Sequence, residues 1–245
     1  MAKRQNIRKG ILIISLLLFP ITMFYISPYI IVVGAVAGIA TGSFIVYSML
    51  FVLSLFFGRA FCGYVCPMAG LQECLVLAQN KKAKGGKRNF IKYFLWVPWV
   101  ATIVVFFVHA GGIKEVDFAF QTTNGISVIH PIAYIVYYGI LMVIIILALT
   151  MGKRAMCHYL CPVSVFMVIG TKISQWLKLP RLRLTSNHDS CVGCKRCDKK
   201  CPMSLDVNAM AVTGNTLNSE CILCGECVDT CPKKSIAYSF SNKPS

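Results

Sequence analysis

The N-terminal two-thirds of the chain alternates between long apolar stretches and short segments that carry charge. Residues 10–58 contain no charged side chain, and these 49 positions are too many for a single membrane helix. A helix needs about 20 apolar residues to cross the hydrocarbon core, so this stretch predicts two spans joined by a turn at 28–42. The four predicted spans of the chain lie near residues 10–27, 41–58, 93–113 and 130–151.

Lys and Arg residues are concentrated in alternate connecting segments. Four precede the first span, seven lie between the second and third, and Lys153 and Arg154 follow the fourth. The turn at 28–42 has none, and the connector at 114–129 has only Lys114. The positive-inside rule therefore predicts that both termini and the middle segment are cytoplasmic. Topology and attraction to anionic lipid explain much of the net charge of +16, so we expect no nucleic-acid partner.

Composition supports a membrane protein and adds a second signal. Hydrophobic residues make up 56% of the chain and charged residues 14%, whereas soluble domains carry about 25% charged residues. The chain also has 13 cysteines. Disulfide scaffolds are small secreted domains, so this cysteine content favours metal or cofactor binding in a membrane protein.

A nine-residue motif occurs twice, each time after a pair of predicted spans. Arg59–Pro67 reads RAFCGYVCP and Arg154–Pro162 reads RAMCHYLCP, with six of nine positions identical at a constant offset of 95 residues. A short apolar segment follows each copy, at 68–78 and 163–179, and is expected to form an interfacial helix. Two spans per repeat predict a pseudo-twofold axis along the membrane normal, with both CxxxCP motifs at the cytoplasmic side.

The last 65 residues, 181–245, are polar and contain the spacing C-x2-C-x2-C-x3-C-P twice. Three thiolates at this spacing surround one face of a cubane, and the fourth cysteine of each run ligates the other cluster. Two [4Fe-4S] clusters are thus predicted, one on Cys191, Cys194, Cys197 and Cys231 and the other on Cys221, Cys224, Cys227 and Cys201. The alternative is a pair of structural zinc sites, which usually use two CxxC pairs per ion.

Basic residues flank both cysteine runs. They are Lys195, Arg196, Lys199, Lys200, Lys233 and Lys234. Such a surface would raise the reduction potential of nearby clusters and could dock an acidic partner, such as a soluble ferredoxin or flavodoxin. The alternative is an ordinary solvated surface.

The repeated motif supplies a second set of four cysteines, namely Cys62, Cys66, Cys157 and Cys161. Residues i and i+4 share a helix face, so each pair would project both thiols to one side, and the pseudo-twofold axis would bring the pairs together. A third iron–sulfur cluster at the membrane boundary, redox or transient metal-binding thiols, and buried structural thiols all remain open. Arg59 and Arg154 would either offset thiolate charge or snorkel to lipid headgroups.

The remaining candidate residues carry weaker signals. Cys74 lies in an apolar stretch and is expected in the core. His109 and His130 end the third span and begin the fourth, where they could cap helices, contact a quinone or hold a haem. His158 replaces Gly63 in the second motif and could neighbour a cluster or carry a proton. No nucleophile elbow, P-loop or dinucleotide fingerprint occurs, so no catalytic residue is predicted.

The sequence GRAFCGYVCP follows the second of the four predicted spans, and GKRAMCHYLCP follows the fourth. Together with the doubled ferredoxin motif, this arrangement resembles the NapH-type family of membrane polyferredoxins. The C-terminal module resembles a bacterial dicluster ferredoxin domain, and the core is similar to the C-terminal half of NosR and to CcoG-type proteins. The resemblance implies electron transfer between the quinone pool, or a cytoplasmic donor, and a partner redox subunit. No flavin-binding domain is seen, so a full NosR role is not expected.

The expected fold is an α-helical membrane protein with four transmembrane helices in two parallel repeats and a C-terminal α+β dicluster ferredoxin domain. The expected domains are residues 1–92, 93–180 and 181–245. The leading hypothesis is an electron-transfer subunit of an oxidoreductase complex in the cytoplasmic membrane. Competing hypotheses are an assembly or maturation factor that reduces a metal or thiol for another enzyme, and a structural anchor for the ferredoxin module.

Overall fold

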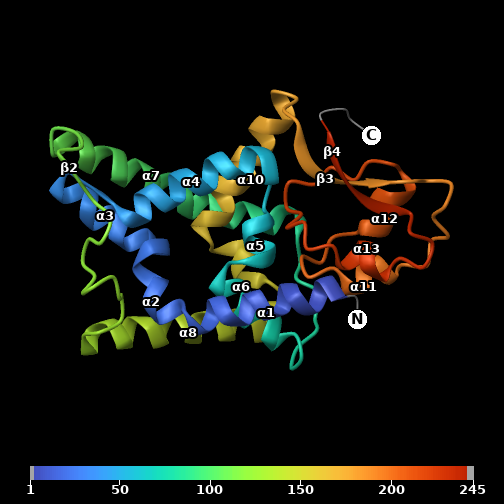
Figure 1. Cartoon of the computed structure of the whole chain (residues 1–245), viewed down its shortest axis with the longest axis horizontal. Coiled ribbons are helices and arrows are strands. Elements are labelled where there is room, and N and C mark those ends of the chain that lie inside the picture. Colours follow the sequence, from blue (N-terminus) through green and yellow to red (C-terminus); the bar gives the residue numbers. More distant parts are fainter. Residues whose placement is uncertain (1–2, 242–245) are drawn as a thin grey trace.

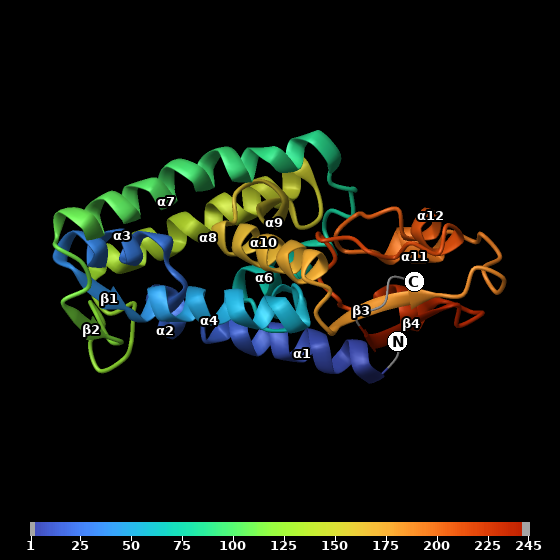
Figure 2. The same cartoon turned by 90° about the horizontal axis from the view of Figure 1, so that it is seen from above.

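The computed structural model describes residues 3–241, so residues 1–2 and 242–245 of the expected first and last domains lie outside the described part. Helices of the N-terminal part run roughly along the long axis of the molecule, and the C-terminal part covers one end of them (Figure 1). The beginning of α1 lies at this same end (Figure 2).

The described helices of the N-terminal part have the following bounds: α1 (Lys3–Leu17), α2 (Phe19–Thr22), η1 (Met23–Ile26), α3 (Pro28–Ala37), α4 (Gly42–Phe57), α5 (Ala60–Tyr64), α6 (Pro67–Leu75), η2 (Gly86–Phe90), α7 (Ile91–His109), α8 (Pro131–Met151), α9 (Ala155–Tyr159) and α10 (Pro162–Trp176). The C-terminal part contains β3 (Arg181–Ser186), α11 (Arg196–Lys200), α12 (Val207–Val212), α13 (Glu226–Thr230) and β4 (Ile236–Ser241).

Two described helices are long and apolar enough to cross a membrane, Arg88–His109 and Pro131–Met151. A third candidate is the pair Lys3–Leu17 and Phe19–Ile26, which is bent by 59° where α2 begins with a proline near its first turn. The expected second span corresponds to α4, whose 16 residues are short for a crossing helix because Gly58, at φ 53°, ends it. The structure therefore supports two or three candidate spans among residues 3–241 and leaves the four-helix arrangement unconfirmed.

The expected turn at 28–42 is a helix followed by a strand, because Pro28 can begin a helix that then continues to Ala37. Gly38 ends this helix at φ 72° and leads into β1 (Ile39–Thr41), which pairs in parallel with β2 (Glu115–Asp117). Both strands lie at the end of the molecule opposite the C-terminal part (Figure 2). The charge-poor connectors thus lie together, far from the ferredoxin-like end.

The two copies of the repeated motif have the same local structure. Each follows a long apolar helix, α4 or α8, and consists of a five-residue helix that contains CxxxC and a helix that begins at the motif's proline. Each proline-initiated helix packs against the long apolar helix of the other repeat: α6 contacts α8, and α10 contacts α4. This exchange is the pattern that a twofold relation between two halves produces.

Helix α10 lies largely inside the molecule, although the sequence predicted an interfacial helix here. Val165, Met167 and Val168 are fully buried, and Gly170 lets the helix approach α4 because a Cβ there would lie 3.1 Å from Phe51 O. The C-terminal part is closed by the antiparallel pair β3 and β4, in register from Arg181↔Ser241 to Ser186↔Ile236. Helix α10 directly follows the second CxxxCP motif, and the β3–β4 pair encloses the two ferredoxin cysteine runs in sequence.

Candidate functional site

Two cavities in the C-terminal part are each lined by four cysteines drawn from both runs. One is lined by Cys201, Cys221, Cys224 and Cys227, and the other by Cys191, Cys194, Cys197 and Cys231. In both sets three cysteines come from one run and the fourth from the other, which is the crossed arrangement that the spacing predicted.

The local backbone explains how each run surrounds a cavity. A residue in the left-handed region, Lys195 at φ 55° or Gly225 at φ 74°, begins a short helix, and that helix carries the third cysteine of the run. The fourth cysteine has extended backbone before its proline, as a pre-proline residue prefers. The first three cysteines of each run therefore line one cavity, and the fourth cysteine lines the other.

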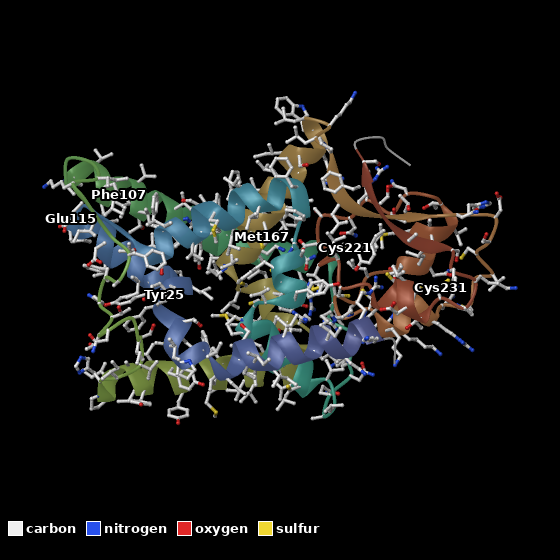
Figure 3. The ribbon with its side chains drawn as sticks, viewed as in Figure 1. Tyr25, Phe107, Glu115, Met167, Cys221 and Cys231 are labelled. Atoms are coloured by element: carbon white, nitrogen blue, oxygen red, sulfur yellow. The ribbon has the colours of Figure 1, made fainter. Side chains whose placement is uncertain are left out.

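The two cavities differ in exposure. In one set Cys194 is exposed, Cys191 and Cys231 are partly exposed and Cys197 is buried. In the other set Cys221 is partly exposed, and Cys201, Cys224 and Cys227 are buried. Figure 3 shows Cys221 at the boundary with the helical part and Cys231 farther along the long axis, away from the helices. One cysteine set is therefore inner, next to the helices, and the other is outer, near solvent.

The four cysteines of the CxxxCP motifs are buried to matching degrees. Cys62 and Cys157 are each 3% exposed, and Cys66 and Cys161 are each 6% exposed. Burial raises the pKa of the Cys66 thiol, and the nearby Cys62, Cys161 and Cys157 raise it further. All four thiols therefore lie within electrostatic range of one another at one place in the structure.

Contacts across the repeat follow the predicted symmetry. Cys62 Sγ lies 3.6 Å from Met167 Sδ, and Cys157 Sγ lies 3.6 Å from Gln72 Nε2. Gln72 and Met167 occupy equivalent positions in the two repeats, as do Cys62 and Cys157. Each half thus contributes a side chain that contacts the first CxxxCP cysteine of the other half.

The two cysteines of each motif do not lie on one helix face, as the i, i+4 spacing predicted. Cys62 lies in α5, but Cys66 follows the end of that helix with an extended backbone at ψ 121°. Cys161 repeats this geometry at ψ 114°. Because Pro67 and Pro162 disfavour helical backbone in the preceding residue, the pair does not share one helix face. The thiols converge through a tight turn instead.

Arg59 and Arg154 are fully buried, which contradicts the alternative that they reach lipid headgroups. Arg154 pairs with Glu73 (2.7 Å) and donates to Cys62 O (2.9 Å), while Arg59 pairs with Glu220 (2.5 Å). Burial works against both charges, but the carboxylates and neighbouring cysteines outweigh it and raise both arginine pKa values.

Several buried donors beside the four cysteines have no hydrogen-bond partner among the described residues. They are Nε and Nη2 of Arg59 and Nε of Arg154. Unpartnered buried guanidinium nitrogens are costly, so a negatively charged group beside them would be stabilised. The thiolate donor set and these donors together fit an iron–sulfur cluster.

His158 is shielded from solvent and lies between the repeat and the C-terminal part. Its Nδ1 donates to Asn89 Oδ1 (3.0 Å). Burial, followed by the positive charges of Arg59 and Lys92, lowers its pKa to about 4. The ring is therefore neutral at physiological pH.

Both CxxxCP motifs touch the loops of the inner cysteine set. A Cβ on Gly63 would overlap the carbonyl oxygen of Ile222, which lies between Cys221 and Cys224. In the second motif His158 occupies the equivalent position and interacts with the backbone of Met203, shortly after Cys201. The two motifs thus lie beside backbone segments that neighbour cysteines of the inner set.

Sequence reasoning missed the acidic residues that bind the buried cations. Glu73 bridges Arg8 (2.6 Å) and Arg154 (2.7 Å), and Glu220 bridges Arg59 (2.5 Å) and Lys92 (2.6 Å). The sequence offered one indication of this role: the chain has only 9 acidic residues against 25 basic ones, so each acidic residue is a candidate ion-pair partner. Each acid in so basic a chain has many possible partners.

The other candidates lie at the surface. Cys74 is exposed, so the prediction that it belongs to the core is wrong. His109 and His130 are exposed at the two ends of the connector between α7 and α8. Within residues 3–241, no three His, Cys, Asp or Glu side chains are grouped as they would be around a single metal ion.

Comparisons with known proteins match the segments that contain the cysteine motifs. A family model described as a 4Fe-4S dicluster domain matches residues 190–236, which include all eight C-terminal cysteines. A model described as a 4Fe-4S binding domain matches twice, at residues 39–84 and 135–180, and each match contains one CxxxCP motif. The chain is similar to proteins whose names describe electron transport or a ferredoxin type. It carries two [4Fe-4S] clusters.

Three relatives illustrate the range of this ferredoxin-type group. An uncharacterized protein of Methanocaldococcus jannaschii is 26% identical over 91% of this chain and 82% of its own length. Escherichia coli YccM, named an electron transport protein, is 22% identical over 88% of this chain and 60% of its own length. The ferredoxin-type protein NapH of Haemophilus influenzae is 24% identical over 74% of this chain and 62% of its own length. No solved structure matches the chain.

Proposed function

We propose that this ferredoxin-type protein is a membrane-bound electron-transfer subunit that links a cytoplasmic donor, or the quinone pool, to a partner redox subunit. The observation that carries the proposal is the close packing of Gly63, in the first CxxxCP motif, against Ile222, which lies between two cysteines of the inner ferredoxin set. Bound iron–sulfur clusters supply one-electron transfer. The protein's own contribution is to hold three cysteine sets in sequence along its long axis.

The ferredoxin cysteines are proposed to ligate as crossed sets. Three cysteines of each run and the last cysteine of the other would hold one [4Fe-4S] cluster each. The inner cluster would be held by Cys221, Cys224, Cys227 and Cys201, and the outer by Cys191, Cys194, Cys197 and Cys231. Support comes from the two cavities, which these sets line separately.

The CxxxCP cysteines, Cys62, Cys66, Cys157 and Cys161, are proposed to hold a third iron–sulfur cluster at the cytoplasmic membrane boundary. Four thiolates in a buried site repel one another unless a cation neutralises them. Arg59 and Arg154 lie beside them with unpartnered nitrogens. These residues would bind the group, hold its negative charge and exclude water.

The outer cysteine set is proposed to be the point of exchange with a soluble partner. Cys194 is exposed, and the basic residues Lys195, Arg196, Lys233 and Lys234 beside the set are exposed as well. A cationic rim around a near-surface redox site steers acidic proteins by electrostatic attraction. A soluble ferredoxin or flavodoxin has this chemistry.

The competing function is an assembly factor that reduces a metal or thiol of another enzyme. That role needs a thiol or metal site which a substrate protein can reach. The CxxxCP cysteines are at most 6% exposed, which favours the relay. The histidines His109 and His130 lie at the opposite end of the molecule, where we propose that a quinone or partner subunit is contacted.

Stopped-flow reoxidation tests the proposal. The full-length protein, reduced and reconstituted in lipid, is mixed with a membrane-soluble quinone, and the visible absorption of the clusters is followed. We expect rapid reoxidation of the wild type and slow reoxidation of Cys157→Ser, with the ferredoxin EPR signals retained. Cys74→Ser is the matched control because that thiol is exposed. Equal reoxidation rates in all three proteins would exclude the CxxxCP cysteines from the path.

A further inference from the structure

A polar cavity of about 310 Å³ lies between the helical part and the C-terminal part, and no cysteine lines it. Its wall includes Lys9 of α1, Glu73 of α6 and Lys153, which follows α8. The opposite wall comes from the ferredoxin side, with Lys199 and Lys200 of α11. The cavity therefore joins the cytoplasmic ends of two membrane helices to the soluble module.

The acidic residues in the wall already have cationic partners. Glu73 pairs with Arg8 and Arg154, and those cations hold its pKa at about 2 against the opposing effect of burial. The two other acids of the wall, Glu226 and Asp229, pair with Arg8 (3.1 Å) and Arg4 (2.8 Å). The carboxylates of the cavity thus contribute little uncompensated negative charge.

Three lysines of the wall, unlike its acidic residues, have no ion-pair partner among the described residues. Lys153 is 5% exposed, and its Nζ donates to Lys199 O at 3.3 Å. Among the described residues, no acid lies within ion-pair distance of Lys153, Lys199 or Lys200. Cys201 and Glu73 act favourably on the Lys153 ammonium from a distance, whereas burial and the ammonium groups of Lys82 and Lys200 act against it. The cavity is therefore shaped and charged for an anion.

We propose that this cavity binds a phosphate group, supplied by the headgroup of an anionic phospholipid. The helices that bound it carry exposed apolar side chains, such as Ile14 and Leu17 on α1 and Ile135 and Ile146 on α8, so they are surrounded by lipid in a membrane. Basic pockets at the cytoplasmic ends of membrane helices bind such headgroups. A headgroup held by Lys153, Lys199 and Lys200 would fasten the ferredoxin module to the membrane part. This inference does not depend on a third cluster.

The test uses the full-length protein in detergent and two soluble probes, a short-chain phosphatidylglycerol and inorganic phosphate. Binding is measured by calorimetry for the wild type, Lys153→Gln and a control, Lys233→Gln. The control removes the same charge from an exposed lysine that does not line the cavity. We expect Lys153→Gln to bind phosphatidylglycerol at least about tenfold more weakly, as loss of one charge-assisted hydrogen bond predicts, and Lys233→Gln to match the wild type.

The outcomes distinguish the sources of phosphate. Binding of inorganic phosphate that depends on Lys153, without binding of phosphatidylglycerol, would assign the site to a soluble phosphate compound and overturn the lipid assignment. Equal affinity of Lys153→Gln and the wild type for both probes would overturn the site itself. If Lys153→Gln loses its ferredoxin EPR signals, the exposed Lys200→Gln substitution gives the same test on a folded protein.

Discussion

Gly63 lies directly against the backbone of Ile222, with no room for a side chain between them. Gly63 stands between the two cysteines of the first CxxxCP motif, and Ile222 stands between Cys221 and Cys224 of the inner ferredoxin set. Helix α5, which carries the first cysteine of its motif, therefore packs directly against a cysteine-bearing loop of the ferredoxin module. A gap here would lengthen the path between the two sites.

The substitution Gly63→Ala tests this contact. A Cβ would overlap Ile222 O, so the two loops must separate, at a cost of about 1–3 kcal/mol typical of overpacking. We expect a lower thermal midpoint and slower quinone reoxidation, with both ferredoxin EPR signals retained. Gly10→Ala is the control because nothing lies within 4 Å of its Cβ position. Reoxidation of Gly63→Ala at the wild-type rate would show that the contact does not matter.

The local parts of the site could be predicted from the sequence because they depend on spacing. The doubled ferredoxin runs identify their cysteines directly, and the repeat offset relates Cys62 to Cys157. The partners of Arg59 and Arg154 could not be predicted, since Glu220 and Glu73 are distant in the chain and hydropathy patterns contain no pairing information.

The number of spans was predicted less well for a physical reason. An uncharged stretch shows that a segment tolerates lipid, but Pro20, Pro28 and Gly58 determine where its helices begin and end. Residues 10–58 therefore form several shorter helices, in which the bent pair that ends at Ile26 is one candidate span and α4 is too short to be counted as a second. The same kind of error affected the CxxxC pairs, where a proline ends the helix face that the spacing indicated.

Crossed ligation is tested at Cys201. Replacing it with Ser should damage the cluster of Cys221, Cys224 and Cys227, because these four residues line one cavity. The EPR signal of the buried cluster should change while that of the outer cluster persists. Cys231→Ser should produce the reverse pattern. Loss of the outer signal in Cys201→Ser would contradict the crossed assignment.

Glu73 is expected to be important for stability. Its replacement by Gln leaves the buried Arg8 and Arg154 without their shared carboxylate, which costs about 3–5 kcal/mol for a broken buried pair. Because the folded-state pKa of Glu73 is about 2, the stabilisation is complete above about pH 4.5 and is lost only as the pH falls toward 2. The loss of stability, measured by denaturant unfolding, should therefore be constant across the neutral range. The exposed Glu115→Gln is the control, and equal stabilities of the two variants would refute the network.

The proposed topology, with both termini in the cytoplasm, rests on the charge distribution and on the contact of α1 with the ferredoxin module, where Arg4 pairs with Asp229 (2.8 Å). We expect a reporter fused after Ser245 to be active in the cytoplasm. A tag near Asn124, in the connector between α7 and α8, should be accessible to an impermeant reagent from outside. The reverse labelling pattern would contradict the positive-inside assignment.

Cys62, Cys66, Cys157 and Cys161 are proposed to hold a third iron–sulfur cluster. The most direct measurement is the iron and acid-labile sulfide content of the purified full-length protein, combined with EPR and compared with that of Cys157→Ser. We predict more iron and sulfide in the wild type than two [4Fe-4S] clusters contain, and a fall to the two-cluster content in Cys157→Ser with both ferredoxin signals intact. A wild type that contains only two clusters' iron and sulfide, unchanged by Cys157→Ser, would contradict the claim.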